Sequence, residues 1–249
     1  MTSSTQTPMQ QDNDRAPELD IEGPLARLRL CRPRQHNRLD PADLPILQAH
    51  LAQVAADPQV RVLVLTGSGR QTFSSGYTLA AIRHELDDRF ERVLDTLEAL
   101  PIPVIGALNG SVYGGATDLA LCCDFRIGVR GSRLFMPAAR FGLHYYPGGL
   151  RRYVANLGLP AAKKLFLTAR TIHAEEMLRI GFLTDLVEPT ELDSAVDSYV
   201  QSLLDNASGA MASMKAALNQ IAAGQADPDT LRRAYEDSLR SPELARRVG

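Results

Sequence analysis

The fold is decided by residues 103–124, PVIGALNGSVYGGATDLALCCD. The first part, residues 103–108, is short and apolar, which predicts a buried strand that ends at the turn signal Asn109-Gly110. The glycine pair Gly114-Gly115 then opens an apolar segment that runs to Cys122 and predicts a helix. A strand without a polar face that leads into a helix through a short glycine-bearing turn is typical of α/β proteins.

The same alternation of strand and helix extends to both sides of this stretch. Further strands are expected at residues 25–30, 60–66 and 125–129, and helices at residues 41–56 and 80–99. Asp40 and Pro41 should be the N-cap and the first residue of the helix at 41–56, because those positions favour these residue types.

The C-terminal third of the chain has a different character, because successive segments all favour helix. These segments are residues 148–157, 160–168, 173–181, 190–205 and 209–223, and the polar residues 224–249 are expected to be helical in part. The residues themselves therefore predict an α/β core, preceded by a polar leader and followed by a helical region.

Composition excludes several classes of protein. The chain has 249 residues with 27 Lys+Arg and 29 Asp+Glu, and its net charge of −2 gives no electrostatic footprint for nucleic acid. The hydrophobic fraction of 45% is too high for a disordered chain, and no apolar run approaches the ~20 residues of a membrane span. The N-terminus lacks the apolar stretch of a signal peptide, and three cysteines without metal spacing fit a reducing compartment. We therefore expect a cytoplasmic protein with neither nucleic-acid nor membrane partners.

Two glycine-bearing turns before helices are candidate sites for an oxygen on which negative charge develops. Gly114-Gly115 opens one helix, and the start of a helix leaves N–H groups free and carries a partial positive charge. Gly76-Tyr77 places another N–H at a strand–helix corner, and two such groups that converge would form an oxyanion hole. Taken alone, each glycine is more often explained by ordinary turn chemistry. The sequence contains neither a nucleotide-binding glycine pattern nor a metal-ligand spacing.

Three segments, in this order, resemble the crotonase (enoyl-CoA hydratase/isomerase) superfamily. They are residues 62–77 with Phe73-Ser-Ser-Gly-Tyr77, residues 103–127 with the glycine pair and Asp118, and residues 137–149 with Gly148-Gly149. The stretch 167–181 is similar to the helix pair that follows in this family, and the resemblance covers roughly residues 20–240. The order of these motifs is far more specific than any one glycine pattern.

The resemblance implies an α/β fold that is a spiral of ββα units, with a helical C-terminal region that forms trimers, often stacked into hexamers. We divide the chain accordingly into a disordered leader (residues 1–18), a spiral core (19–190) and a helical oligomerisation region (191–249). The family acts on acyl-CoA, in fatty acid metabolism among other pathways, and needs no cofactor or metal beyond the coenzyme A of its substrate. A related pantetheine thioester on a carrier protein is an open alternative.

The resemblance also assigns residues to the site. The thioester oxygen would lie between the backbone N–H groups of Tyr77 and Gly115, which stabilise an enolate. The residues expected to bind substrate are Ser75, Gly76, Thr78, Leu79, Gly114, Ala138 and Tyr146.

This chain departs from the family at both catalytic positions. Hydratases of the family use two Glu side chains on water, and their positions here hold Asp118 and Ala138. General acid–base catalysis contributes roughly 100- to 10,000-fold, so ordinary hydration becomes doubtful. His144 and Tyr145 lie in the loop that borders the acyl pocket, and the decarboxylase branch has a Tyr near the position of Tyr145.

The catalytic candidates are therefore Asp118, His144 and Tyr145. Asp118 is alternatively an acid favoured by the dipole of its helix, and His144 and Tyr145 alternatively line the pocket without reacting. The sequence predicts an acyl-CoA-processing lyase or isomerase of the hydratase/isomerase type. Decarboxylation, isomerisation, thioester hydrolysis, or thioester or partner binding without turnover remain the alternatives.

Overall fold

A computed structural model describes residues 14–248 of the chain. Most of the expected leader, residues 1–13, lies outside the described residues. Within the described part, the backbone N–H of Arg15 already donates to the carbonyl of Cys31 (2.8 Å), and the first strand begins at Glu18.

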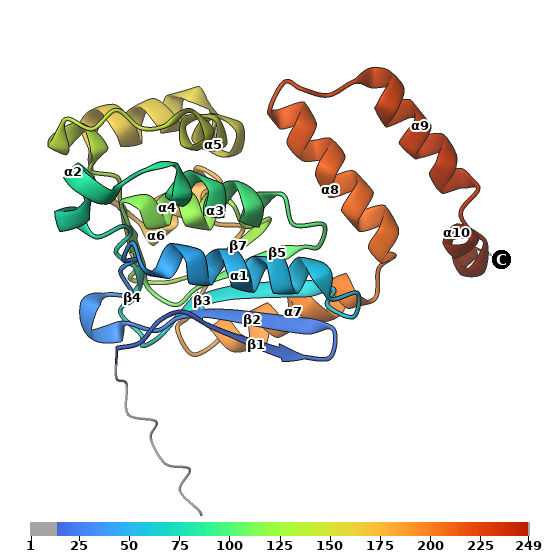
Figure 1. The fold of residues 1–249 in the computed structure, drawn as a ribbon, viewed down its shortest axis with the longest axis horizontal. Coiled ribbons are helices and arrows are strands. Elements are labelled where there is room, and N and C mark those ends of the chain that lie inside the picture. The colour runs from blue at the N-terminus through green and yellow to red at the C-terminus, as the bar shows by residue number, and fades with distance from the viewer. Residues whose placement is uncertain (1–13, 249) are drawn as a thin grey trace, which may run out of the picture.

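The larger of two sheets has six strands and forms the centre of the molecule (Figure 1). Its strands, in spatial order, are β1 (Glu18–Glu22), β2 (Leu25–Leu30), β3 (Val62–Gly67), β5 (Val104–Leu108), β7 (Phe125–Val129) and β10 (Asp185–Val187). β1 and β2 are antiparallel, and every other neighbouring pair is parallel. The strand expected at 103–108 is thus confirmed as an interior strand, flanked by β3 and β7.

The smaller sheet has four short strands and stands beside the larger one. Its order is β4 (Thr72–Ser74), β6 (Ser111–Tyr113), β8 (Arg133–Phe135) and β9 (Ile172–His173). Three times the chain adds one strand to the large sheet, the next to the small sheet, and then enters a helix. The spiral of ββα units expected from the resemblance is therefore confirmed.

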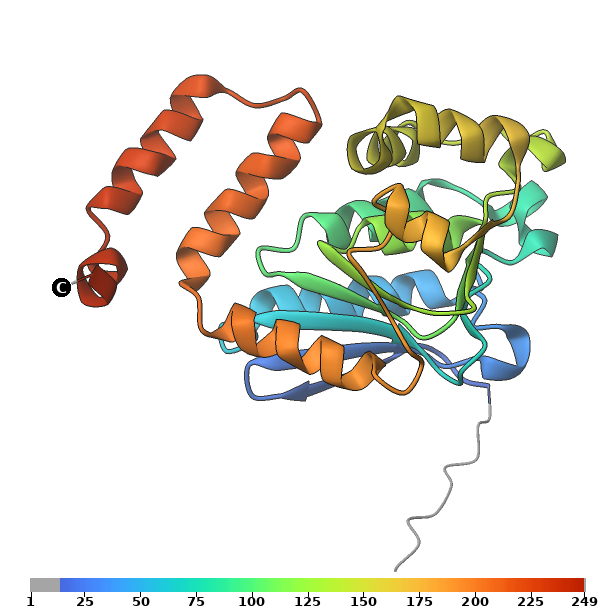
Figure 2. The same ribbon diagram turned by 180° about the vertical axis from the view of Figure 1, so that it is seen from behind.

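Both faces of the interior strands β3 and β5 are buried, which explains why these strands lack a polar face. Val62 and Val64 of β3 belong to one buried cluster, with α7 (Leu192–Leu204), and Leu63 and Leu65 belong to the other. That second cluster contains apolar residues of α1 (Asp43–Ala56) and α3 (Asp88–Glu98). Figures 1 and 2 show α7 on the face opposite to α1 and α3. Strands covered by helices on both faces are characteristic of parallel sheets.

Two expectations about helix ends are wrong. Asp40 does not cap α1, because the N-cap is Ala42 and the Asp40 carboxylate accepts hydrogen bonds from Arg38 and Thr78. The single helix expected at 80–99 is divided into a 3-10 turn (Leu79–Ala81), α2 (Ile82–Glu85) and α3. The division occurs because Asp87 caps α3, accepting from the N–H of Arg89.

The remaining helices follow the expected segments. They are α4 (Gly115–Leu121), α5 (Pro147–Thr168), α6 (Ala174–Arg179), α8 (Ser208–Ala222), α9 (Pro228–Leu239) and α10 (Pro242–Val248), with 3-10 turns at Pro33–Gln35 and Ala138–Phe141. α5 is interrupted at Gly158, whose φ of 74° lies outside the helical region. No helix of residues 14–248 combines the length and apolarity needed to cross a membrane.

The last three helices extend away from the two sheets (Figures 1 and 2). The Lys215 ammonium attaches α8 to the core, because it donates to the carboxylate of Asp124 (2.7 Å) and the carbonyl of Ile102 (2.9 Å). Large apolar side chains remain exposed along these helices: Met214, Leu218, Ile221, Tyr235, Leu239, Leu244 and Val248.

Candidate active site

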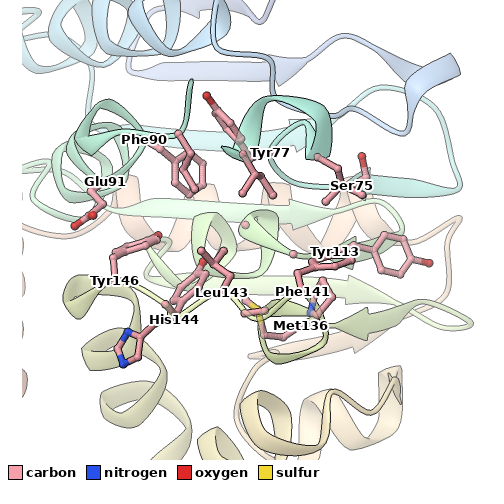
Figure 3. A pocket seen from close by; sticks show the side chains of 18 of the residues that line it. Ser75, Tyr77, Phe90, Glu91, Tyr113, Met136, Phe141, Leu143, His144 and Tyr146 are labelled. Carbon is pink, nitrogen blue, oxygen red and sulfur yellow. The ribbon is translucent and has the colours of Figure 1, made fainter. Parts of the chain in front are cut away.

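A cavity of about 500 Å³ lies between the small sheet, α3 and residues 135–146 (Figure 3). Most of its lining is apolar or aromatic, and it includes the start of α4 at Gly114 and Gly115. A concave, largely apolar cavity with a few polar groups is the usual form of a small-molecule site.

Two backbone amides meet at this cavity. Around Tyr77, Leu39 donates to the carbonyl of Gly76 (2.8 Å) and Thr78 donates to the carbonyl of Leu39 (2.9 Å). Successive amides of an extended chain point to opposite sides, so the N–H of Tyr77 points away from Leu39. On that side lies Gly115, where an ideal Cβ would be 3.6 Å from the Tyr77 nitrogen. Gly115 is the first residue of α4, so its N–H has no intrahelical acceptor.

Glycine is required for these amides to lie so close together. A Cβ on Gly76 would lie 2.7 Å from the nitrogen of Gly115, a distance that would force the backbone apart. Gly76 also has a φ of 81°, and Gly114 has a φ of 54° with a ψ of −131°. Both conformations are rare for residues with a side chain.

The structure places Asp118 behind the cavity wall. Its carboxylate is fully buried and accepts from Arg152, Nε to Oδ1 at 2.8 Å and Nη2 to Oδ2 at 3.1 Å. Arg152 is fully buried as well, and also donates to Asp95 (2.8 Å) and Glu98 (3.1 Å). Asp118 is absent from the residues that line the cavity, so it reaches the cavity only through a neighbour.

That neighbour is Tyr146, whose hydroxyl donates to Oδ2 of Asp118. Tyr146 lines the cavity (Figure 3). Its ring stacks on that of Tyr145, with 4.5 Å between the ring centroids. Burial raises the pKa of Tyr146 far above its usual range, and the nearby charge of Asp118 raises it further. Tyr146 therefore keeps its proton and acts as a neutral hydrogen-bond donor.

Tyr145 presents a buried hydroxyl to the same region. The residue is 7% exposed, lines the cavity, and its hydroxyl has no hydrogen-bond partner among residues 14–248. Burial raises the pKa of Tyr145 well above its usual value, so this hydroxyl is also neutral. A Cβ on Gly149 would lie 2.3 Å from Cε1 of Tyr145, which explains why the third motif carries glycine there. A buried hydroxyl without a partner is costly unless a ligand supplies one.

His144 and Ala138 border the cavity without supplying an acid to it. His144 is exposed, and its ring points away from Tyr77 and Phe90 (Figure 3). Ala138 is 4% exposed and lies in the 3-10 turn that forms one wall. The position where the resemblance expects a second carboxylate is therefore an apolar surface.

The cavity brings together most of the residues predicted from the sequence. Ser75, Tyr77, Leu79, Gly114, Gly115, Ala138, His144, Tyr145 and Tyr146 line it, whereas Gly76, Thr78 and Asp118 do not. Thr78 instead donates its hydroxyl to the carbonyl of Leu39 (3.1 Å) and to Asp40.

Phe90 and Glu91 line the cavity from α3, although no motif in the sequence marks them as site residues. A Cβ on Gly115 would lie 2.9 Å from Cζ of Phe90, so the Phe90 ring lies directly against the amide pair. Both residues belong to a segment rich in charged residues, and such a segment in a sequence indicates a helix exposed to solvent. Within residues 14–248, no three His, Cys, Asp or Glu side chains are grouped closely enough to hold a metal ion.

Comparison with known proteins identifies the family. The model of the enoyl-CoA hydratase/isomerase family matches residues 20–238. The chain is 34% identical over 209 residues to a crotonyl-CoA hydratase of Syntrophomonas wolfei, covering 81% of this chain and 80% of the relative. It is 32% identical over 219 residues to a short-chain-enoyl-CoA hydratase of Clostridium acetobutylicum, with coverages of 85% and 83%.

A solved structure agrees with this assignment. The crystal structure of an enoyl-CoA hydratase from Bacillus anthracis superimposes with a TM-score of 0.84 at 28% identity, covering 93% of each chain. Motif order, fold and family model agree over nearly the same residues, and the chain belongs to the enoyl-CoA hydratase/isomerase family.

Proposed function

We propose that the cavity binds an acyl-CoA or related pantetheine thioester, with the thioester oxygen accepting hydrogen bonds from the N–H groups of Tyr77 and Gly115. The observation that carries this proposal is the close approach of these two amides, which glycine at position 76 permits. Donors fixed in advance at a developing oxyanion stabilise it without reorganisation, and each is typically worth ~100- to 1000-fold in rate.

The surroundings of the amides suit an enolate. Gly115 lies at the N-terminus of α4, where the partial positive charge of the helix favours an anion. Phe90 packs against Gly115, and the Tyr77 hydroxyl donates to the carbonyl of Glu85 (3.1 Å), which holds that ring beside Phe90. An apolar neighbourhood strengthens hydrogen bonds to a developing charge.

The two positions that hold the Glu pair in the family's hydratases do not present two carboxylates to this cavity. Ala138 offers none, and the carboxylate of Asp118 is held by Arg152 behind Tyr146. We propose that Asp118 and Arg152 position Tyr146, and that the hydroxyls of Tyr145 and Tyr146 are the polar groups that meet the acyl part. The proposed reaction is therefore an isomerase- or lyase-type step through the enolate, not hydration by paired Glu.

The second candidate function is thioester binding without turnover. The missing carboxylate at Ala138 and the buried ion pair of Asp118 favour it. We propose that the protein, whether it is an enzyme or a binding protein, assembles as a trimer or hexamer through the exposed apolar side chains of α8 to α10.

A titration with coenzyme A and acyl-CoA, followed by a screen of enoyl-, dienoyl- and malonyl-type thioesters, separates these candidates. Turnover of any thioester supports the enzyme, and saturable binding without turnover supports the binding protein. If no thioester binds, both candidates are rejected.

A further inference from the structure

We propose that Thr117 and Tyr153 are positioning residues for the amide of Gly115, which their two buried hydroxyls orient and polarise through a chain of hydrogen bonds. This role rests on the proposed function, in which the amides of Tyr77 and Gly115, here called the oxyanion pair, bind the thioester oxygen. Neither Thr117 nor Tyr153 lines the cavity, so both act from behind its wall.

The direction of the Gly115 amide is set by the residue before it. The carbonyl of Gly114 and the N–H of Gly115 belong to one planar, trans peptide unit, so the two groups point in opposite directions. Glycine restrains its own backbone little, and Gly114 has a φ of 54° and a ψ of −131°. The orientation of the amide therefore depends on the groups that hold the carbonyl of Gly114.

Thr117 supplies two donors to this carbonyl. Its hydroxyl donates to the oxygen of Gly114 at 2.6 Å, and its backbone N–H donates to the same oxygen at 3.0 Å. A carbonyl oxygen has two lone pairs, so these two bonds hold it from two directions. The peptide unit that carries the Tyr77 amide is held in a similar way, because the carbonyl of Gly76 accepts from the N–H of Leu39 (2.8 Å).

The hydroxyl of Tyr153 completes the chain. It comes from α5 and contacts the hydroxyl of Thr117, and both residues are fully buried. The carbonyl of Gly114 can only accept, so the single hydroxyl proton of Thr117 goes to it, and Tyr153 is the donor toward Thr117. Burial raises the pKa of Tyr153 far above its usual range, so its hydroxyl keeps the proton that it donates. The bonds therefore run in one direction, from Tyr153 through Thr117 to the peptide unit of Gly115.

A chain of this direction strengthens the Gly115 amide as a donor. Hydrogen bonds that follow one another polarise their neighbours, by about 10–30% per bond. The same bonds restrict rotation of the peptide unit, so the donor is fixed before a substrate arrives. A threonine hydroxyl often bonds to a carbonyl three residues before it in a helix, and such a bond alone has only a local effect. The second hydroxyl, which Tyr153 contributes from another helix, indicates a role beyond the first turn of α4.

Nearly isosteric substitutions test the chain. Thr117→Val and Tyr153→Phe each remove one hydroxyl, whereas Thr117→Ser keeps it. Infrared difference spectroscopy of butyryl-CoA labelled with ¹³C at the carbonyl measures how far the carbonyl stretch moves to lower frequency on binding. We expect Thr117→Val to reduce this shift by at least about 10–30%, Tyr153→Phe to reduce it by less, and Thr117→Ser to retain it.

The matched control is Thr66→Val. The hydroxyl of Thr66 donates to the carbonyl of Ala107 (2.9 Å), and neither residue lines the cavity. Thr66→Val and Thr117→Val thus each lose a hydrogen bond from a hydroxyl to a backbone carbonyl, and both should lower the midpoint of thermal unfolding. Only Thr117→Val should also change the carbonyl frequency of the bound ester.

The outcomes separate this role from the proposed function. An unchanged frequency in Thr117→Val, or an equal change in Thr66→Val, would overturn the role of the hydroxyl chain and leave the oxyanion pair standing. A wild-type protein that binds the ester without any shift to lower frequency would overturn the oxyanion pair itself. If Thr117→Val does not fold, Tyr153→Phe decides: a reduced shift supports the chain, and an unchanged shift rejects it.

Discussion

Arg152 is the residue on which the back of the cavity depends. Its fully buried guanidinium contacts Asp118, Asp95 and Glu98, and through Asp118 it fixes the hydroxyl of Tyr146. A buried ion pair adds little to the free energy of unfolding compared with apolar residues in place of both partners. Loss of only one partner is costly, because it leaves an unpaired buried charge. We therefore propose that the pair serves mainly to define one position for Tyr146.

Replacement of Arg152 tests this role. Arg152→Met would leave the carboxylate of Asp118 buried without its cation, and should lower the free energy of unfolding by about 3–5 kcal/mol. The control is Lys164→Met, which removes the exposed ion pair with Glu176. This variant should lower the free energy of unfolding by less than about 1 kcal/mol. Denaturant titrations of both variants would measure the difference, and equal losses would contradict a special role for Arg152.

The adjacent cysteines give a second prediction at this scale. Both are buried, and burial raises the pKa of Cys123 to about 12 and that of Cys122 well above its usual range. The thiolate is the reactive form, so at pH 8 a thiol reagent should leave Cys122 and Cys123 unmodified in the native protein. Both should react after unfolding in denaturant, and mass spectrometry of digested protein would reveal early modification if the prediction is wrong.

At the scale of elements, long apolar segments were predictable and short ones were not. The strand at 103–108 and the helix after Gly114 could be predicted because their patterns extend over several residues. The four strands of the small sheet have two or three residues each, too few for any periodicity, and only the family resemblance implied them. The Asp87 cap and the position of Glu91 depend on tertiary packing of α3.

Two glycines in helical segments should respond in opposite directions. Gly158 interrupts α5 with a φ of 74° and a ψ of 160°, so Gly158→Ala forces a residue with a Cβ into a conformation that essentially only glycine adopts and should destabilise the protein by about 1–3 kcal/mol. Gly209 lies inside α8, where a Cβ meets nothing closer than 3.8 Å, so Gly209→Ala should stabilise by up to about 1 kcal/mol. Thermal unfolding of the two variants is the measurement, and shifts of the same sign would contradict this account of the helices.

At the scale of the molecule, acidic side chains gather at one cavity although the net charge of the chain is close to zero. The net charge of −2 conceals a cavity whose lining carries Asp87, Asp88 and Glu91 without Lys or Arg. Composition could exclude a nucleic-acid footprint, but it could not reveal this local field, which arises because α3 brings these carboxylates to the cavity beside the start of α4.

The extended helices carry the prediction about assembly. α8 exposes Met214, Leu218 and Ile221 along one segment, and such apolar side chains are typical of an interface between subunits. We expect analytical ultracentrifugation to give three or six times the chain mass of 27.2 kDa. Leu218→Glu should shift the distribution toward smaller species, and a wild-type monomer at micromolar concentration would refute the assembly.

The central claim is that a thioester oxygen is bound between the amides of Tyr77 and Gly115. Infrared difference spectroscopy of butyryl-CoA labelled with ¹³C at the carbonyl measures the hydrogen bonding of that oxygen directly. We expect the carbonyl stretch of the bound ester to move to lower frequency than in water, because two fixed donors polarise the carbonyl. Gly115→Ala places a Cβ 3.6 Å from the Tyr77 nitrogen and 2.9 Å from Phe90, and should reduce the shift. A bound ester whose carbonyl absorbs at or above its frequency in water would contradict the claim.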